Sequence, residues 1–232
     1  KTLQQVEPRT PISTYGTSIT VAGSYYLTTN LTSTNTTTDA ITISADNVTI
    51  DLNGFALINT AGTGTSADGI SFTSRKNVTI RNGTIQGFLR GIFGNGVSPG
   101  ILIENLKIGV CFTRGISLLP SADTPGGGVR NNVVYTIGGS SVGAADQEIR
   151  GIEASFGSFV VEGNTVGGVT GKGTNDGFGI YCSNNTDTFV INNRVSRTDN
   201  GIRLNGPNEY RDNFTSNCTT PYLAGTDRGN NN

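Results

Sequence analysis

The chain has 232 residues, 34% of them hydrophobic and 14% charged, and its net charge is −1. Regularly recurring Ile, Val and Phe exclude a disordered chain, and the near-zero charge excludes the broad positive field that nucleic-acid binding needs. Histidine is absent, so any chemistry proceeds without the commonest general base and the commonest metal ligand. The 33 glycines and the abundant Asn, Thr and Ser favour turns and short strands over helices.

The first strand that the sequence predicts lies in "SYYLTTNLTS", beginning at Ser24. A Gly-Ile tetrapeptide then returns six times: "DGIS" from Asp68, "RGIF" from Arg90, "RGIS" from Arg114, "RGIE" from Arg150, "FGIY" from Phe178 and "NGIR" from Asn200. The interval from Gly69 to Gly91 is 22 residues, the length of a repeat built from three short strands. We therefore interpret the six copies as one structural position that the chain visits six times.

Repeats of this kind predict a parallel β-helix, in which each coil stacks on the last at about 4.8 Å. A single coil cannot bury its aliphatic side chains, but a stack of coils can. The isoleucines of the tetrapeptides are expected to form one buried column, and each glycine to allow close approach beside it. The column consists of Ile70, Ile92, Ile116, Ile152, Ile180 and Ile202.

A second pattern follows the tetrapeptides: an aliphatic residue, any residue, Asn or Gly, any two residues, and another aliphatic residue. It places Asn82, Asn105, Asn131, Gly163, Asn192 and Asp212 at equivalent sites. Asn and Gly adopt left-handed backbone angles at low cost, so these sites predict a tight corner between two strands. Stacked asparagine side chains at this corner are also expected to bond one another's backbones in a ladder.

Together with these coils, "VEPRTPIST" from Val6 and "ADNVTIDLNGFAL" from Ala45 resemble the secreted bacterial right-handed β-helix proteins of the pectate-lyase-like superfamily. The resemblance covers almost the whole chain and implies an all-β, single-stranded right-handed parallel β-helix of about seven coils. Residues 1–38 would form an N-terminal cap and the first strands of the same domain, and residues 39–232 the helix. It also implies a secreted or extracellular protein. Because the superfamily includes lyases, hydrolases and adhesins, the resemblance is specific for fold rather than activity.

Side chains alternate across a strand, so the residue after each isoleucine is expected to point outward. The outward column comprises Ser71, Phe93, Ser117, Glu153, Tyr181 and Arg203, and Asn205 follows two residues later. Its second half places an acid, a phenol and a guanidinium on adjacent coils. One interpretation is a substrate-binding surface; the other is a solvated face on which Glu153 and Arg203 merely neutralise each other.

Two swollen coils point to the same half of the column. The interval between tetrapeptides rises to 36 residues from Gly115 to Gly151 and to 28 from Gly151 to Gly179. The additional residues lie in glycine-rich segments, "YTIGGSSVGAADQEIR" from Tyr135 and "GGVTGKGTNDGF" from Gly167. Long loops on a rigid stack are expected to form the side of a groove.

Arg114, Arg150 and Arg203 would make this groove basic, and Tyr135 and Tyr181 would give it flat rings. Guanidinium groups bind carboxylates through paired hydrogen bonds, and aromatic rings suit sugar rings. We therefore expect an acidic polysaccharide as the partner, alginate first and pectate second, and neither nucleic acid nor a membrane. The chain is expected to act as a monomer.

The expected reaction is metal-independent β-elimination by a polysaccharide lyase, with no cofactor. The paired aspartates and the histidine of pectin hydrolases are missing, and too few acidic side chains converge for a calcium site. Lys172 is the expected base, Tyr135 the expected acid and Tyr181 the competing phenol. The expected substrate-binding residues are Arg114, Arg150, Glu153, Arg203 and Asn205.

The rival interpretation is a non-catalytic β-helix that serves as a carbohydrate-binding module, an adhesin or an assembly subunit. It explains the same coils without any catalytic residue. The three cysteines, Cys111, Cys182 and Cys218, show no metal-ligand spacing. They are expected as small buried residues, with one disulfide as the alternative.

Overall fold

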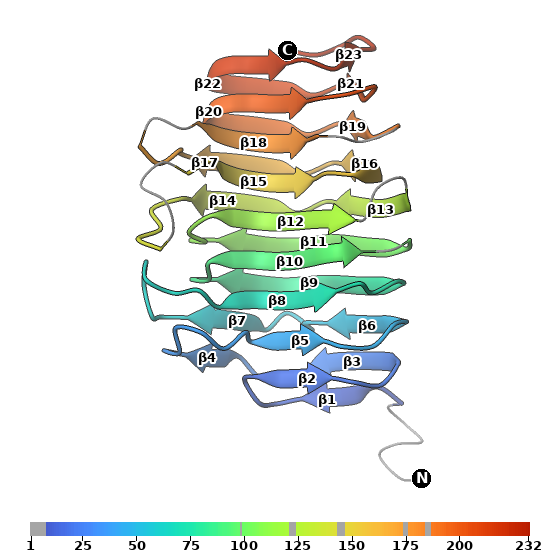
Figure 1. Ribbon diagram of the computed structural model, residues 1–232, viewed down its shortest axis with the longest axis vertical. Coiled ribbons are helices and arrows are strands. Elements are labelled where there is room, and N and C mark those ends of the chain that lie inside the picture. Colours follow the sequence, from blue (N-terminus) through green and yellow to red (C-terminus); the bar gives the residue numbers. More distant parts are fainter. Residues whose placement is uncertain (1–7, 98, 121–123, 143–146, 174–175, 184–186) are drawn as a thin grey trace.

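The computed structural model describes residues 8–97, 99–120, 124–142, 147–173, 176–183 and 187–232. All paired strands in this part of the chain are parallel, and they wind around one axis as a right-handed helix (Figure 1). The predicted single-stranded parallel β-helix is therefore confirmed. No helix among these residues is long and apolar enough to cross a membrane.

The strands form three stacks that run along the rod, named here in the order in which each coil meets them after its tetrapeptide. The first stack consists of β2 (Thr17–Ile19), β5 (Ile41–Ile43), β8 (Asp68–Thr73), β10 (Arg90–Val97), β12 (Arg114–Pro120), β15 (Ile149–Ala154), β18 (Gly177–Cys182) and the C-terminal parts of β20 (Arg194–Leu204) and β22 (Phe214–Leu223). Strands thus begin well before the first Gly-Ile tetrapeptide and continue after the last.

The second stack consists of β1 (Thr10–Ile12), β3 (Gly23–Leu27), β6 (Val48–Asp51), the N-terminal parts of β9 (Val78–Gln86) and β11 (Ile101–Gly109), β13 (Thr124–Arg130), β16 (Gly157–Glu162), β19 (Phe189–Ile191), β21 (Glu209–Arg211) and β23 (Thr226–Asp227). The third consists of β4 (Leu31–Ser33), β7 (Ala56–Asn59), the C-terminal parts of β9 and β11, β14 (Val133–Ile137), β17 (Thr165–Val169) and the N-terminal parts of β20 and β22.

The predicted isoleucine column is confirmed in the first stack. Each isoleucine of a tetrapeptide pairs in register with the isoleucine of the next, from Ile70 to Ile202. All six side chains are at most 1% exposed. Ile41 pairs with Ile70 and extends the column by one coil toward the N-terminus. The column is part of one continuous apolar core along the rod.

The glycine of each tetrapeptide is required by contact between coils. A Cβ atom on Gly115 would lie 2.5 Å from the carbonyl oxygen of Gly151, and a Cβ atom on Gly151 would lie 2.6 Å from that of Gly179. Glycine and isoleucine both face inward, because a Cβ atom on Gly151 would also meet the core side chain of Val166. The residues on either side of the Gly-Ile pair therefore both face outward, which doubles the outward columns of this stack.

The predicted left-handed corners are confirmed, since the six sites have φ angles between 54° and 65°. The amide ladder, however, lies one residue later than predicted. Asn132 Nδ2 donates to Asn164 Oδ1 at 3.0 Å, and Asn164 Nδ2 donates to Asn193 Oδ1 at 3.0 Å. The left-handed residue is the corner itself, and the buried residue after it faces its counterpart in the next coil.

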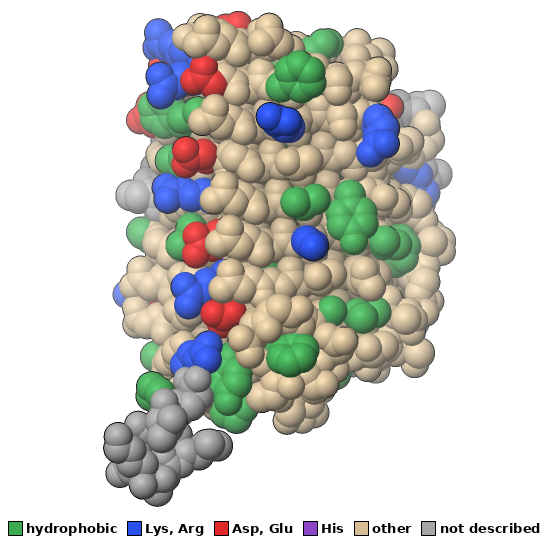
Figure 2. Space-filling view, turned by 180° about the vertical axis from the view of Figure 1, so that it is seen from behind, with side chains coloured by type: hydrophobic (Ala, Val, Ile, Leu, Met, Phe, Trp, Pro, Cys, Tyr) green, Lys and Arg blue, Asp and Glu red, His purple; other side chains and the backbone are tan. Residues whose placement is uncertain are grey.

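Charges alternate along one outer column of the second stack, visible at the left edge of Figure 2. In register, this column runs through Asp51, Arg81, Glu104, Arg130 and Glu162. Arg81 pairs with Asp51 at 3.2 Å, and Arg130 pairs with Glu162 at 3.8 Å. Because Arg81, Arg130 and Glu162 are substantially exposed, each ion pair contributes at most about 1 kcal/mol.

All three cysteines are free thiols, so the alternative of a disulfide is not realised. Cys111 and Cys182 are fully buried, and burial raises the pKa of each thiol to about 12. Both are therefore protonated core residues, in agreement with the small buried residues that the sequence predicts.

Candidate functional site

A cavity of about 490 Å³ opens on the outer face of the first stack, over β10, β12, β15 and β18. Most of its walls come from residues that flank the inward Gly-Ile pairs, or from the segments just before them. The lining residues are Leu89, Arg90, Phe93, Thr113, Arg114, Ser117, Leu119, Gln147, Arg150, Glu153, Phe156, Tyr181 and Ser183. The same tetrapeptides thus build the core and the surface above it.

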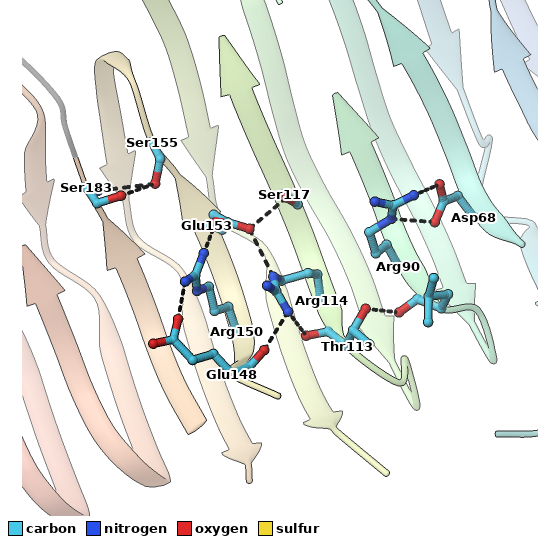
Figure 3. Close-up of polar contacts among 11 residues, drawn as sticks. Asp68, Arg90, Thr113, Arg114, Ser117, Glu148, Arg150, Glu153, Ser155 and Ser183 are labelled. Carbon is cyan, nitrogen blue, oxygen red and sulfur yellow. Dashed lines mark hydrogen bonds and ion pairs between the residues drawn. The ribbon is translucent and has the colours of Figure 1, made fainter. Parts of the chain in front are cut away.

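Glu153 lies at the centre of a hydrogen-bond network in this cavity (Figure 3) and is only 4% exposed. One carboxylate oxygen, Oε2, accepts from Ser117 Oγ at 2.8 Å and from Arg114 Nε at 3.0 Å. The other oxygen, Oε1, accepts from Arg150 Nη1. A buried carboxylate is tolerated only with such partners, and here both of its oxygens have them.

Glu148 supports both arginines from the segment that precedes β15. Its carbonyl oxygen accepts from Arg114 Nη1 at 2.6 Å, and its carboxylate pairs with Arg150 Nη2. Burial lowers the pKa of the Arg114 guanidinium, while the charge of Glu153 opposes that effect. Burial also acts to lower the pKa of Arg150, but Glu153 and Glu148 outweigh it and raise that pKa above its ordinary value. Both guanidinium groups are therefore oriented and charged.

A second ion pair lies toward the N-terminal end of the cavity. Arg90 donates to Asp68 through Nε at 2.8 Å and through Nη2 at 2.7 Å, and its guanidinium carbon lies 3.3 Å from the ring centroid of Phe93. Burial raises the pKa of the Asp68 carboxyl, and the paired Arg90 opposes that rise. This bidentate pair fixes the guanidinium plane over the ring.

Aromatic rings lie at the other end. The guanidinium carbon of Arg150 is 3.7 Å from the Tyr181 ring centroid, and Phe178 meets Tyr181 edge to face at 5.3 Å. The guanidinium carbon of Arg203 lies 5.4 Å from the Tyr181 ring centroid, and the Arg203 side chain makes no ion pair or hydrogen bond to any described residue. It is therefore the cation on this face whose charge no described carboxylate neutralises.

Three polar atoms in and beside the cavity are buried without a hydrogen-bond partner among the described residues. They are one acceptor, Gln147 Oε1, and two donors, Arg150 Nε and Arg203 Nε. Buried polar groups in folded proteins are normally satisfied, so these three atoms are exceptions in and beside the cavity.

The structure brings together four of the residues that the sequence nominated: Arg114, Arg150, Glu153 and Tyr181 all line the cavity. Arg203 follows Tyr181 in the same outward column, and Asn205 lies two residues further along, where its backbone N–H donates to the carbonyl oxygen of Cys182 at 2.8 Å. Glu153 is neutralised, but by Arg114 and Arg150 rather than by Arg203.

Tyr135 and Lys172 do not line the cavity. Tyr135 belongs to β14 in the third stack, and its ring occupies the space above Gly109. Lys172 forms an antiparallel bridge with Gln147, with reciprocal backbone hydrogen bonds of 3.2 Å. The swollen segments therefore meet beside the cavity through Gln147, although residues 143–146 and 174–175 within them lie outside the described part of the chain.

Sequence reasoning placed Phe93 in the outward column without assigning it to the site, and it missed Asp68, Arg90, Gln147 and Glu148. For Asp68 and Arg90 the signal was present, because each is the first residue of a tetrapeptide. The outward column was taken to include only the residue after isoleucine, but the inward Gly-Ile pair also turns the first residue outward. No periodic signal marks Gln147 or Glu148, which reach the cavity from a loop.

A second hollow, of about 580 Å³, lies on the outer face of the second stack near the C-terminal end. Its lining includes Phe189, Tyr210 and one exposed ion pair, between Glu209 and Arg228. The Arg228 guanidinium lowers the pKa of the Glu209 carboxyl. This hollow has no buried charged network, so the cavity on the first stack is the stronger candidate site.

Searches of protein-family models, curated proteins and solved structures found no match to the chain. The resemblance to the pectate-lyase-like superfamily therefore rests on the quoted motifs and on the parallel β-helix itself.

Proposed function

We propose that the chain binds a linear acidic polysaccharide in the cavity on the first stack. The observation that carries this proposal is the row of guanidinium groups of Arg90, Arg114 and Arg150, which line the cavity and are fixed by carboxylates. Sugar hydroxyls both donate and accept hydrogen bonds, so they suit a cavity whose lining offers guanidinium N–H groups and the hydroxyl of Ser117.

The aromatic side chains add a second reason. The rings of Phe93 and Tyr181 belong to one outward column, three coils apart along the rod, with Ser117 and Glu153 between them. Aromatic faces suit the apolar faces of sugar rings, and a column along the rod suits a polymer lying parallel to it. The residues between the rings provide hydrogen-bonding groups.

The charges favour an acidic polymer over a neutral one. Arg90, Arg114 and Arg150 are balanced by three carboxylates, those of Asp68, Glu148 and Glu153. Arg90 Nη1 and Arg114 Nη2 make no hydrogen bond to any described residue, and Arg203 adds an unpaired charge. These groups can donate hydrogen bonds to substrate carboxylates, so a uronate polymer, alginate first and pectate second, is the proposed ligand.

Replacing Phe93 by Ala is expected to weaken binding of alginate oligosaccharides by about two- to tenfold, since one aromatic contact is lost. Isothermal titration calorimetry measures the change. Phe189→Ala removes an exposed ring from the second stack and serves as the matched control, with affinity expected to stay at the wild-type value. Equal affinities for wild type and Phe93→Ala would contradict binding of the polysaccharide in this cavity.

Cleavage of the bound polymer is a second candidate function, favoured by the position of Tyr181 under Arg150. In β-elimination, a base takes the proton beside the uronate carboxylate, a carbon–carbon double bond forms, the glycosidic bond breaks, and its oxygen gains a proton. Arginine would neutralise the carboxylate, and the Tyr181 hydroxyl would take part in the proton transfer. Lys172, beside the cavity wall, is the candidate base.

If the chain is a lyase, uronate polymers incubated with it should gain ultraviolet absorbance from the unsaturated product. Tyr181→Phe is then expected to lower the rate by about 10² or more, because the hydroxyl that moves the proton is gone. Lys172→Ala and Tyr135→Phe, assayed alongside, separate the cavity phenol from the pair that the sequence nominated. If neither alginate nor pectate gains ultraviolet absorbance, the lyase function is contradicted and only the binding function is retained.

A further inference from the structure

The outer face of the third stack is free of acidic side chains. None of its strands (β4, β7, β14, β17, the C-terminal parts of β9 and β11, and the N-terminal parts of β20 and β22) contains Asp or Glu. In Figure 2, blue side chains lie among green ones in the middle of this face, and most of the red ones form a column to the left of it. Because the net charge of the chain is −1, the absence of acidic side chains is a property of this face and not of the whole protein.

The cations on this face are unpaired. Lys107, Arg194 and Arg197 are exposed, and their side chains make no ion pair or hydrogen bond to any residue that the structure describes. In the first-stack cavity, by contrast, each arginine is paired with a carboxylate. The charge of the third stack is therefore available to a partner outside the chain.

Lys107 and Arg194 belong to one of two parallel columns on this face, and Arg197 follows Ser196 of the other. The first runs in register through Lys107, Val133, Thr165, Arg194 and Phe214. Three coil spacings separate Lys107 from Arg194, about 14 Å at 4.8 Å per coil. Val133 is 41% exposed and Phe214 is 52% exposed. Two cations, with an aliphatic side chain and a hydroxyl between them and a ring after the second, thus stand in one column.

Tyr135 stands in the second column, between Gly109 and Gly167. Its ring lies over Gly109, where any larger residue would collide with it: a Cβ atom there would be 2.3 Å from the ring. Its hydroxyl makes no hydrogen bond to any described residue. The two glycines leave the ring without flanking side chains, and Ser196 and Ser216 continue the column as hydroxyls.

We infer that this surface, named here the basic strip (Lys107, Val133, Tyr135, Arg194, Arg197 and Phe214), binds a linear acidic polysaccharide that lies along the rod. The cations would pair with carboxylates, the rings would contact sugar rings, and the serine and threonine hydroxyls between them would bond to sugar hydroxyls. Three cations are too few for the broad positive field of a nucleic-acid site. The apolar side chains stand singly among hydroxyls and do not form the continuous apolar face that membrane insertion needs.

The basic strip does not depend on the cavity of the first stack, since the two surfaces share no residue. The test is the affinity of polygalacturonate for the full chain at low ionic strength, measured by isothermal titration calorimetry. Lys107→Ser with Arg194→Ser is expected to weaken binding by about two- to thirtyfold, because two surface charge contacts are lost. Added salt is expected to weaken wild-type binding and to narrow the difference between the two proteins.

The matched control is Lys76→Ser with Arg211→Ser, which removes the same charge from exposed positions away from the strip. It is expected to bind like the wild type; an equal loss in the control would show a net-charge effect and overturn the strip. Tyr135→Ala is expected to weaken binding and Tyr135→Phe to retain most of it, because the ring is kept.

Two further outcomes separate this inference from the proposed function. If Phe93→Ala loses binding while the Lys107 and Arg194 double variant keeps it, the polymer occupies the cavity and the strip is overturned. If the double variant loses binding while Phe93→Ala keeps it, the polymer occupies the strip and the cavity is not its binding site. A single-stranded DNA oligonucleotide that binds as tightly as polygalacturonate would also contradict the strip, since it would show attraction to any polyanion.

Discussion

Aspartate in place of Ile152 is expected to unfold the rod. Ile152 is fully buried and pairs in register with Ile116 on one side and Ile180 on the other. A carboxylate at this position would stand in the middle of an apolar column with no cation to pair with, at a cost of several kcal/mol. Circular dichroism and urea unfolding are expected to show loss of the β-sheet signal or of the cooperative transition.

Ile152→Val is the matched control, because it removes one methylene group and adds no charge. Its unfolding free energy is expected to fall by only about 0.5–1.5 kcal/mol. A cooperative transition in the aspartate variant at the same urea midpoint as in the valine variant would contradict the buried column.

Replacing Glu153 by Gln is expected to be the most damaging change in the cavity. The amide keeps the shape of the side chain but removes the charge that faces Arg114 and Arg150, which leaves two guanidinium groups in a buried site with one carboxylate fewer. Removing one partner of a buried ion pair costs about 3–5 kcal/mol. Urea unfolding of both proteins measures the difference.

Glu162→Gln makes the same chemical change at a half-exposed ion pair, with Arg130 at 3.8 Å in the second stack. Its cost is expected to be at most about 1 kcal/mol. If the two glutamine variants lose the same unfolding free energy, burial of the Glu153 network contributes nothing beyond a surface ion pair.

The columns of the first stack were predictable because two periodicities set them. The interval between tetrapeptides places equivalent residues one above another, and the strand period of two decides which face each residue takes. Insertions such as the 36-residue interval do not disturb this, because additional residues leave the stack as loops. Ile116 and Ile152 therefore still pair in register across the longest insertion.

The contacts of the cavity were not predictable from spacing. Arg114 and Arg150 were expected to be free for substrate carboxylates, but both bind Glu153, and Glu148 reaches them from a loop that has no repeat. Side-chain torsions and loop paths decide such contacts, and neither leaves a periodic trace in a sequence.

Tyr135 was also misplaced by the length of the swollen segment that it begins. A glycine-rich segment suggests a loop from its first residue, yet Val134 and Ile137 are buried in the core, so Tyr135 belongs to a strand. The loop begins only after Ile137. The core pattern of the strand was thus the better signal for the position of Tyr135 than the glycine content of the segment that follows.

The alternating charges of the second stack have a consequence for how coils find their neighbours during folding. The Gly-Ile tetrapeptides are nearly identical, so burial of their isoleucines stabilises the stacking of almost any two coils about equally. If one coil were left out, Arg81 would meet Arg130, or Asp51 would meet Glu104, and like charges directly opposite each other on adjacent strands are destabilising. Stacking in the correct order instead sets every acid of this column beside a base. The surface charges therefore specify the order of the coils, whereas the apolar core stabilises the stack without specifying that order.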